Sequence, residues 1–335
     1  MTLLTDTIRA GHLELKNRLV MAPCATERSD AGAVTKQLLA HYDERTKGGH
    51  VGLVIVEHSF IRPDGRASKN QLSVAKDADV PGLSELSALL HKNGSHALMQ
   101  INHAGSAARD GISEGESISP SGFKNPLSPT QDEMKTPREM TKEDIDALVE
   151  SFAEAAVRVK KAGFDGCELH SAHGYLLNQF YSPLTNKRED AYSGHTIDGR
   201  IRLHLEVIKA VRAEVGEDFL LAMRLGGCDY TEGGSTIDDA VSAAKQLEAA
   251  GLDLLDLSGG MCSYRREGHT ENGYFRDMSE AVKRAVSIPV ILTGGIADRA
   301  GADELLAAGS ADMIGVGRAI LKNPNWADEA MDETK

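Results

Sequence analysis

The sequence is poor in aromatic residues and in positive charge. Only 7 Phe, 7 Tyr and 1 Trp occur among 335 residues, and 37 Lys and Arg stand against 50 Asp and Glu, a net charge of −13. Proteins that bind nucleic acid usually present a basic surface, and single strands also need aromatic side chains for base stacking. Both shortages argue against a nucleic-acid partner.

Cysteine is scarce, and no long hydrophobic run occurs. The four cysteines, Cys24, Cys167, Cys228 and Cys262, form no Cys-x-x-Cys pair, so we expect neither a disulfide framework nor a metal cluster. No apolar run approaches the roughly 18 residues of a membrane span, and the N-terminal segment lacks the apolar core of a secretory signal. A cytoplasmic protein with no membrane partner and no metal site is expected.

A weak internal repeat is present instead. At residues 162–165, 250–253 and 308–312, an amphipathic helix pattern ends in Ala-Gly, an Asp follows, and an apolar run begins. Glycine just after a helix supplies the left-handed cap residue, and a short link then leads into a buried strand. This join is typical of parallel βα units.

Eight short apolar segments are expected to be strands of one parallel sheet. They are residues 19–22, 52–57, 97–101, 166–170, 219–225, 252–257, 289–293 and 313–316. Helical patterns lie between them, the clearest over 141–162, where Thr141 and Asp144 form a near capping box. The pattern predicts an α/β fold, a (β/α)8 TIM barrel spanning 1–335 as a single domain.

Two segments fall outside the repeat. Residues 7–17 are expected to form an N-terminal hairpin that closes the bottom of the barrel. Residues 103–140 follow the third strand, are rich in Ser, Gly and Pro, and lack periodicity. A connection of this length is usually functional, and its position predicts a lid over the carboxyl-terminal face, where barrel enzymes keep their sites.

Polar residues gather where the expected strands end. They lie at 24–26, 57–58, 100, 170–175, 224, 258–260, 294–295 and 317–318. Buried strand ends that carry His, Gln, Arg and Tyr are costly unless something binds there. This pattern predicts an enzyme.

The last two units contain Thr293-Gly294-Gly295 and Gly315-Val316-Gly317-Arg318. Glycines let backbone N–H groups approach a phosphate and an arginine neutralises it, and barrels commonly bind phosphate after strands seven and eight. Plain tight turns are the alternative.

His170, His173 and Tyr175 offer hydrogen-bond donors to a carbonyl oxygen and a source of a proton. A metal site would need a third ligand, for which Glu168 is a candidate, and satisfied histidines at a strand end are the bland alternative. Arg224 and Gln100 lie at the ends of the fifth and third expected strands and are expected to line one polar pocket, although an arginine can also extend to the rim. Asp253 and Asp256 are weaker candidates because such carboxylates often pair locally.

Together these segments resemble the Old Yellow Enzyme family of flavin-dependent ene-reductases, in its single-domain NADH:flavin oxidoreductase form. The matching segments are 17–23, 48–57, 100–105, the run HSAHGYLLNQFYSPLTNKRED at 170–190, 200–202, Arg224, 258–260, 293–295 and 317–318. The resemblance covers nearly the whole chain, and the motif at 170–190 is highly specific. It implies a (β/α)8 barrel, in agreement with the strand count.

The resemblance also implies non-covalent FMN. The cofactor contacts it implies are Pro23, Cys24, Ala25, His58, Gln100, Arg224, Gly260, Gly294, Gly295, Gly317 and Arg318. Gln100 would hydrogen-bond the pyrimidine end of the flavin, and Arg224 would stabilise the anionic reduced ring. Gly295, Gly317 and Arg318 would hold the phosphate.

Tyr175, His170 and His173 are the implied catalytic residues. The imidazoles would bind the carbonyl oxygen of an α,β-unsaturated carbonyl compound, and Tyr175 would protonate the adjacent carbon. NADH or NADPH would reduce the flavin in the same site first, which implies ping-pong kinetics. Relatives often form dimers or tetramers, so a homo-oligomer is expected.

Some positions depart from the family pattern. Ala25 stands where many members place a Thr or Cys that tunes the flavin, and His58 stands where a small residue is usual. The order Pro23-Cys24-Ala25-Thr26 looks like the FMN domain of the 2-enoate reductases, although this chain ends before their iron–sulfur region would start. Electrons are therefore expected directly from a nicotinamide or another outside donor.

Three alternatives stay open at this point. An FMN-dependent barrel could act on a substrate other than an enone, a phosphate-binding barrel could be a lyase or isomerase without flavin, and a flavin-binding protein could have lost turnover. No expected strand ends in the lysine that Schiff-base chemistry uses.

Overall fold

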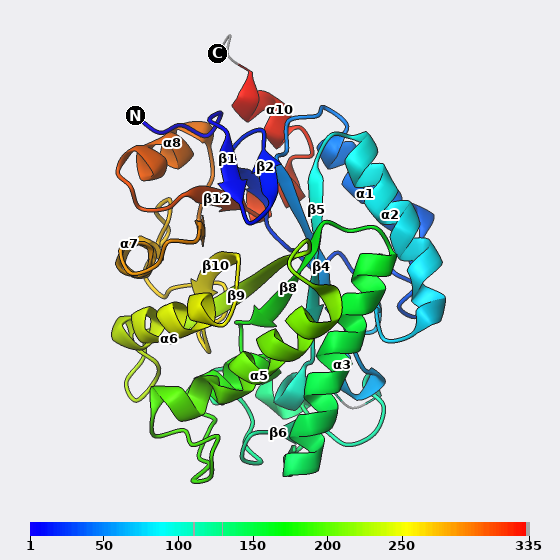
Figure 1. The fold of residues 1–335 in the computed structure, drawn as a ribbon, viewed down its shortest axis with the longest axis vertical. Coiled ribbons are helices and arrows are strands. Elements are labelled where there is room, and N and C mark those ends of the chain that lie inside the picture. The colour runs from blue at the N-terminus through cyan, green and yellow to red at the C-terminus, as the bar shows by residue number, and fades with distance from the viewer. Residues whose placement is uncertain (110, 129, 333–335) are drawn as a thin grey trace.

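The chain forms a closed barrel of eight parallel strands surrounded by helices (Figure 1). The computed structural model describes residues 1–332 except 110 and 129. In order around the barrel the strands are β3 (Leu19–Met21), β4 (Leu53–Phe60), β5 (His96–Asn102), β8 (Gly166–Ser171), β9 (Leu220–Cys228), β10 (Leu254–Gly259), β11 (Val290–Thr293) and β12 (Met313–Val316). The predicted (β/α)8 barrel is confirmed, and each expected strand is present within a few residues of its predicted ends.

Helices cover the outside of the barrel. The α-helices are α1 (Lys36–Thr46), α2 (Val80–Lys92), α3 (Lys142–Lys161), α4 (Leu176–Tyr181), α5 (Ile197–Val215), α6 (Ile237–Ala249), α7 (Arg276–Lys283), α8 (Arg299–Ala307), α9 (Arg318–Lys322) and α10 (Trp326–Met331). Short 3-10 turns occupy Pro63–Gly65, Asp77–Asp79, Gly105–Ala107 and Gln131–Glu133. No helix in the described part of the chain is both long and apolar enough to cross a membrane.

Helix α3 shows how the sequence sets these elements. Thr141 accepts a hydrogen bond from the backbone of Asp144, and the Asp144 side chain accepts one from the Thr141 backbone, so the capping box is complete. Ile145, Leu148 and Phe152 are buried on one face at helical spacing. Gly163, just past the end, has φ +84°, a conformation that favours glycine.

The N-terminal hairpin closes the end of the barrel at which the strands begin, as predicted. Strands β1 (Ile8–Ala10) and β2 (Leu13–Leu15) pair antiparallel. Ala10, Leu13 and Leu15 pack in one buried cluster with inward-facing strand residues such as Leu53 and Leu98. The interior of the barrel next to the hairpin is therefore filled by apolar side chains.

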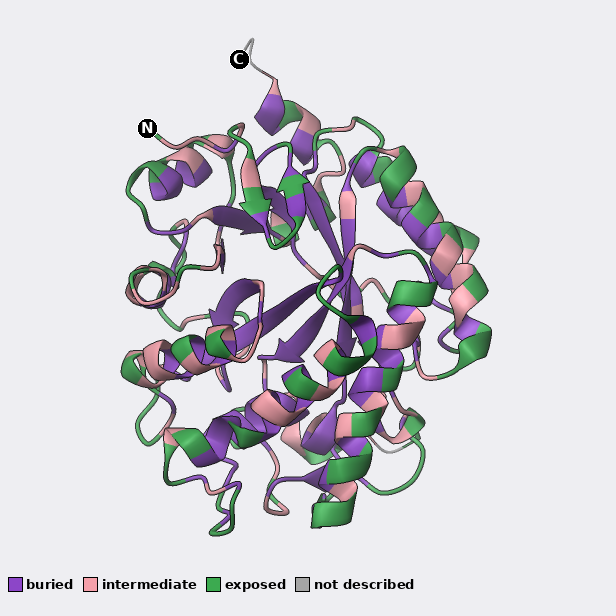
Figure 2. Ribbon diagram, in the orientation of Figure 1, coloured by how far each residue is buried: buried purple, intermediate pink, exposed green. Residues whose placement is uncertain are grey.

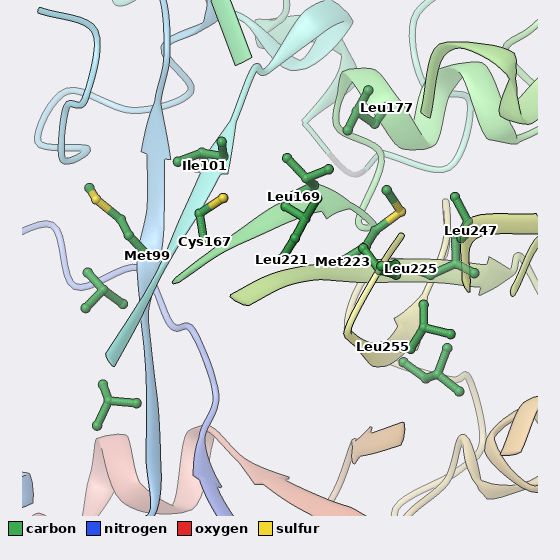
Figure 3. Packing of buried hydrophobic residues seen from close by; sticks show 14 of the residues in the cluster. Met99, Ile101, Cys167, Leu169, Leu177, Leu221, Met223, Leu225, Leu247 and Leu255 are labelled. Carbon is green, nitrogen blue, oxygen red and sulfur yellow. The ribbon is translucent and has the colours of Figure 1, made fainter. Parts of the chain in front are cut away.

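Side-chain alternation separates the outer core from the barrel interior. On β8, Cys167 and Leu169 pack outward in the large cluster between strands and helices (Figure 3). Glu168 and His170 point the other way, since successive strand residues face opposite sides. Figure 2 shows the barrel strands buried along most of their length, while the helices expose their outer faces.

The predicted lid segment, 103–140, lies over the lower right of the view in Figure 1 and carries the short parallel pair β6 (Ile118–Ser119) and β7 (Arg138–Glu139). Arg188 Nη1 donates hydrogen bonds to the carbonyl oxygens of Pro120 and Met140, at 2.8 and 2.7 Å. These bonds fasten both arms of the segment to the motif that follows β8.

Candidate active site

A cavity of about 650 Å³ opens where the barrel strands end. It is the larger of the two described hollows, and its lining comes from residues at or just past the ends of the strands. Of the candidate residues, it brings together Pro23, Cys24, Ala25, His58, Gln100, His170, His173, Tyr175, Arg224, Gly294, Gly295, Gly317 and Arg318. The carboxyl-terminal face thus carries one continuous site.

Gly260 is the exception among the candidate residues. Its backbone N–H donates to the carbonyl oxygen of Cys228 at 3.1 Å, and an added Cβ would lie 2.2 Å from Oδ1 of Asp229. Glycine is needed there for close packing beside Asp229, and the residue does not line the cavity. Its neighbour Ser258 does, so the Ser-Gly-Gly signal marks the right strand end through a different residue.

The lid segment does not line the cavity among its described residues. Its residues Ala104, Ala107 and Ala108 pack against Tyr175, and a Cβ on Gly174 would lie 2.5 Å from Asn125 Nδ2. The segment therefore supports the turn that carries His173 and Tyr175 from behind, and its role as a lid stays a prediction.

Three imidazoles and one phenol form the centre of the site. The ring of His170 lies 5.2 Å from that of His173, 5.0 Å from that of Tyr175 and 6.0 Å from that of His58. Burial, together with the other positive groups of the site, lowers the pKa of His170 and His173 well below the ordinary value. Burial raises the pKa of Tyr175 to about 12. At neutral pH all of these rings are uncharged, and Tyr175 keeps its proton.

The neighbours of the two histidines determine which nitrogen faces the cavity. Nε2 of His173 is 2.7 Å from Oγ of Ser258, a residue of β10. We assign the Ser258 hydroxyl as the donor to Nε2, and this assignment puts the proton of the neutral His173 ring on Nδ1. In His170, Nδ1 is buried without a partner, and a buried unpaired N–H is costly. The proton of His170 therefore belongs on Nε2, so each ring offers one donor.

A layer of buried polar residues lies directly below this cluster. Gln100 Nε2 donates to Oε1 of Glu168 at 2.7 Å, and Thr293 Oγ1 donates to Oδ1 of Asp256 at 2.7 Å. Arg224 Nε is 3.1 Å from Oδ2 of Asp256. Glu168 thus holds Gln100, and Asp256 holds Arg224, the two residues expected to contact the flavin ring. The sequence alone suggests Glu168 only as a metal ligand and Asp256 only as a carboxylate that pairs locally.

The two carboxyl groups of this layer are not equivalent. Burial raises the pKa of Glu168 well above its ordinary value, and the nearby Asp256 raises it further. Burial also raises the pKa of Asp256, but Arg224 and Thr293 oppose the shift. Asp256 forms an ion pair with Arg224, whereas Glu168 has no ion-pair partner among the described residues, so we take Glu168 as the protonated member and Asp256 as the counter-ion of Arg224.

The other end of the cavity has the features expected of a phosphate site. Gly294 and Gly295 have φ of +135° and +72°, and a Cβ on Gly295 would lie 2.4 Å from the carbonyl oxygen of Glu271. Only glycine fits this turn, which leaves backbone N–H groups open. Arg318 Nη2 donates to Oη of Tyr274 at 2.9 Å, so its cation is held in place beside the turn.

Several lining residues were not predicted from the sequence. They are mainly Tyr264, Arg265 and Tyr274 of the loop after β10, and Lys322 of α9. The ring of Tyr264 lies 6.1 Å from that of His173, at the mouth of the cavity. Residues 260–275 lack periodicity just as 103–140 do, and that signal could have marked them as a second functional loop.

The arrangement fits FMN from end to end. One end carries a glycine turn and an arginine for a phosphate, and the other carries Gln100 and Arg224, which match the polar edge of a flavin ring. Between them lie donors for a carbonyl oxygen and a neutral phenol. Fold and site together define a flavin-dependent oxidoreductase of the barrel class.

Comparison with known proteins agrees. Residues 4–334 match the model of the NADH:flavin oxidoreductase / NADH oxidase family, and the chain belongs to this family. It is 38% identical over 331 residues to an NADH oxidase of Thermoanaerobacter brockii, covering 97% of this chain and 50% of that protein. It is 38% identical over 318 residues to an NADPH dehydrogenase of Halalkalibacterium halodurans, covering 94% of this chain and 90% of that protein.

Solved structures show the same likeness. Morphinone reductase superposes with a TM-score of 0.85 at 26% identity, covering 98% of this chain and 89% of that one. The Old Yellow Enzyme homologue from Zymomonas mobilis also gives 0.85 at 26% identity, covering 99% and 93%. The resemblance inferred from the sequence motifs is confirmed, FMN is the cofactor of the family, and a nicotinamide is its electron donor.

Proposed function

We propose that this chain uses NAD(P)H and FMN to reduce the activated C=C bond of α,β-unsaturated carbonyl compounds. The observation that carries the proposal is the group formed by His170, His173 and Tyr175 at one wall of the cavity. Two neutral donors and a neutral phenol suit a carbonyl oxygen next to a carbon that must receive a proton. The family match speaks against a lyase or isomerase without flavin.

FMN, when bound here, supplies the two-electron redox chemistry that links NAD(P)H oxidation to alkene reduction. Gly295, Gly317 and Arg318 would hold its phosphate, and Gln100 and Arg224 would hold the polar edge of its ring. The positive charge of Arg224 would lie at that edge, and Asp256 is placed to hold the direction of its side chain.

The protein's own residues then act on the substrate. His170 and His173 donate hydrogen bonds to the carbonyl oxygen, which draws electron density away from the conjugated alkene. Tyr175 holds a proton on Oη and transfers it to the carbon beside the carbonyl. Its raised pKa keeps it protonated through the neutral range.

The Tyr175→Phe variant tests the proposal. We expect steady reduction of 2-cyclohexen-1-one to fall by about 10²-fold or more, the usual contribution of a general acid, while bleaching of the flavin by NAD(P)H keeps its rate. Tyr192→Phe is the matched control. The Tyr192 hydroxyl donates to Glu206 Oε2 at a distance of 2.8 Å, and Tyr192 does not line the cavity.

Equal slowing of both half-reactions in Tyr175→Phe would contradict the role given to Tyr175. A parent enzyme that oxidises NAD(P)H but reduces no enone in a substrate panel would contradict the proposed substrate class and favour a different acceptor.

A further inference from the structure

His58 is a third imidazole in the site, and the reaction described above does not use it. It follows Glu57 on β4 at the point where pairing with β5 shifts register, between Val56 and Ser59. Such a bulge re-aims side chains. Glu57 hydrogen-bonds Thr26, and the ring of His58 lies 5.2 Å from that of Tyr175.

One face of His58 is held by amide groups of fixed direction. Oε1 of Gln71 accepts a hydrogen bond from the backbone N–H of Ala67 at 2.7 Å. The amide of Gln71 cannot be turned over without losing that bond, so its NH₂ group faces His58. Gln71 Nε2 is 2.9 Å from Nδ1 of His58 and 3.3 Å from the His58 carbonyl oxygen.

Asn102 contacts the same nitrogen, with its Nδ2 at 3.3 Å from Nδ1 of His58. Because Gln71 Nε2 can only donate, Nδ1 must accept and the proton of the neutral ring is on Nε2. A second proton on Nδ1 would point at the NH₂ of Gln71. Burial already lowers the pKa of His58 to about 4, so the ring is neutral in the neutral range.

The Nε2–H group is the free end of His58. No hydrogen-bond partner of Nε2 exists among the described residues, and the atom is not sealed from the cavity that His58 lines. In His173, by contrast, Nε2 is taken by Ser258. His58 therefore presents a donor of fixed tautomer beside the two that would bind the carbonyl oxygen.

We propose that His58 is a positioning and specificity-determining residue that donates to a second, uncharged oxygen of the substrate. The inference rests on the proposed function, because it places the substrate in this cavity. The preferred substrate class is then an unsaturated carbonyl compound with a second carbonyl group. A carboxylate fits less well, because the three imidazoles are neutral and Arg224 already has Asp256 as counter-ion.

The test compares ligands that differ by one carbonyl group. Cyclohexanone and cyclohexane-1,4-dione have no C=C bond to reduce, so their dissociation constants can be measured by perturbation of the flavin absorbance of the oxidised holoenzyme. One neutral hydrogen bond corresponds to a change of roughly tenfold in affinity. We expect the dione to bind about tenfold more tightly than cyclohexanone.

The variants then locate this preference. His58→Ala should abolish the dione preference by weakening binding of the dione, with a much smaller change in the Kd of cyclohexanone. His58→Gln places an N–H at a similar reach and should restore part of the preference. In turnover, His58→Ala should raise KM for an unsaturated dicarbonyl compound with little effect on kcat, as for a binding contact.

Equal affinity for the two ligands in the parent, or a preference that survives His58→Ala, would overturn the assignment. Because no ligand in the titration is reduced, the result is independent of enone turnover. An enzyme that reduces no enone but shows the His58-dependent preference would refute the proposed function and leave the role of His58 standing.

Discussion

Gln100 Nε2 donates a 2.7 Å hydrogen bond to Oε1 of Glu168 in the middle of the barrel. Both side chains are almost completely buried. Since the NH₂ group points down into the barrel, the carbonyl oxygen of the Gln100 amide is directed toward the cavity. By accepting this bond, Glu168 thus sets the amide orientation that Gln100 would present to the edge of a bound flavin.

Glu168→Leu should therefore weaken FMN binding. The Gln100 amide would lose the acceptor that orients it and would leave a buried N–H unpaired, at a cost of about 1–3 kcal/mol. We expect the Kd for FMN, measured by quenching of its fluorescence, to rise at least fivefold. Glu168→Gln keeps an acceptor of the same shape and should bind FMN nearly as the parent does.

Glu168→Gln also tests the charge of Glu168. If burial keeps this carboxyl protonated, an amide replaces one neutral group with another and the midpoint potential of the flavin stays unchanged. A clear rise in potential would show that a carboxylate had been removed, and that Glu168 is ionised in the parent.

Arg224 and Asp256 should shift the flavin potential in opposite directions. Arg224→Ala removes a positive charge from the ring edge, so the potential should fall and FMN retention should weaken. Asp256→Asn removes the counter-ion 3.1 Å from Arg224 Nε, so the potential should rise. Potentials from dye-coupled reductive titration check both signs, and shifts of the same sign would contradict the ion pair as the controlling feature.

Ser258→Ala should impair substrate binding through His173. Without the hydroxyl at 2.7 Å from Nε2, the ring can move its proton to Nε2 and present an acceptor on Nδ1 to the substrate. We expect kcat/KM for an enone to fall about three- to tenfold, the effect of part of one hydrogen bond. Ser258→Thr, which keeps the hydroxyl, is the control, and an equal loss in both variants would point to packing instead.

Much of this site was predictable because a barrel places every strand end at the same face. The polar strand ends were visible in the sequence, and all the candidate residues except Gly260 line one cavity. What could not be predicted is which inward-facing residues of different strands lie at the same height along the barrel axis. Glu168 and Gln100 become neighbours only through the register of β5 and β8, which pairs them directly.

The direction of the His58 side chain could not be predicted for a related reason. Simple alternation along β4 does not say where a residue beside Glu57 points, because the bulge between Val56 and Ser59 interrupts it. Nor does sequence spacing reveal that Gln71, thirteen positions later, holds its ring. The family resemblance implies a cofactor contact for His58, which stays a prediction, and the ring of His58 also lies near those of His170 and Tyr175, which are expected to bind substrate.

A buried histidine away from the site should make folding stability depend on pH. His204 of α5 is fully buried, with Nε2 at 2.7 Å from Ser171 Oγ, and burial lowers its pKa from 6.5 to about 3. Between these values the unfolded chain binds a proton at His204 and the folded chain does not, so stability falls as the pH falls. At pH 4.5 this difference in proton binding at His204 lowers the free energy of unfolding by roughly 3 kcal/mol.

His204→Gln removes this titration and keeps a polar group near Ser171. The free energy of unfolding of the variant minus that of the parent should be about 2–3 kcal/mol larger at pH 4.5 than at pH 7.5. This comparison holds even if the two proteins differ in stability at pH 7.5. Urea unfolding with excess FMN at both pH values measures this difference. His195→Gln, at an exposed position, should show no such gain, and a parallel pH dependence of parent and His204→Gln would mean that His204 is protonated equally in both states.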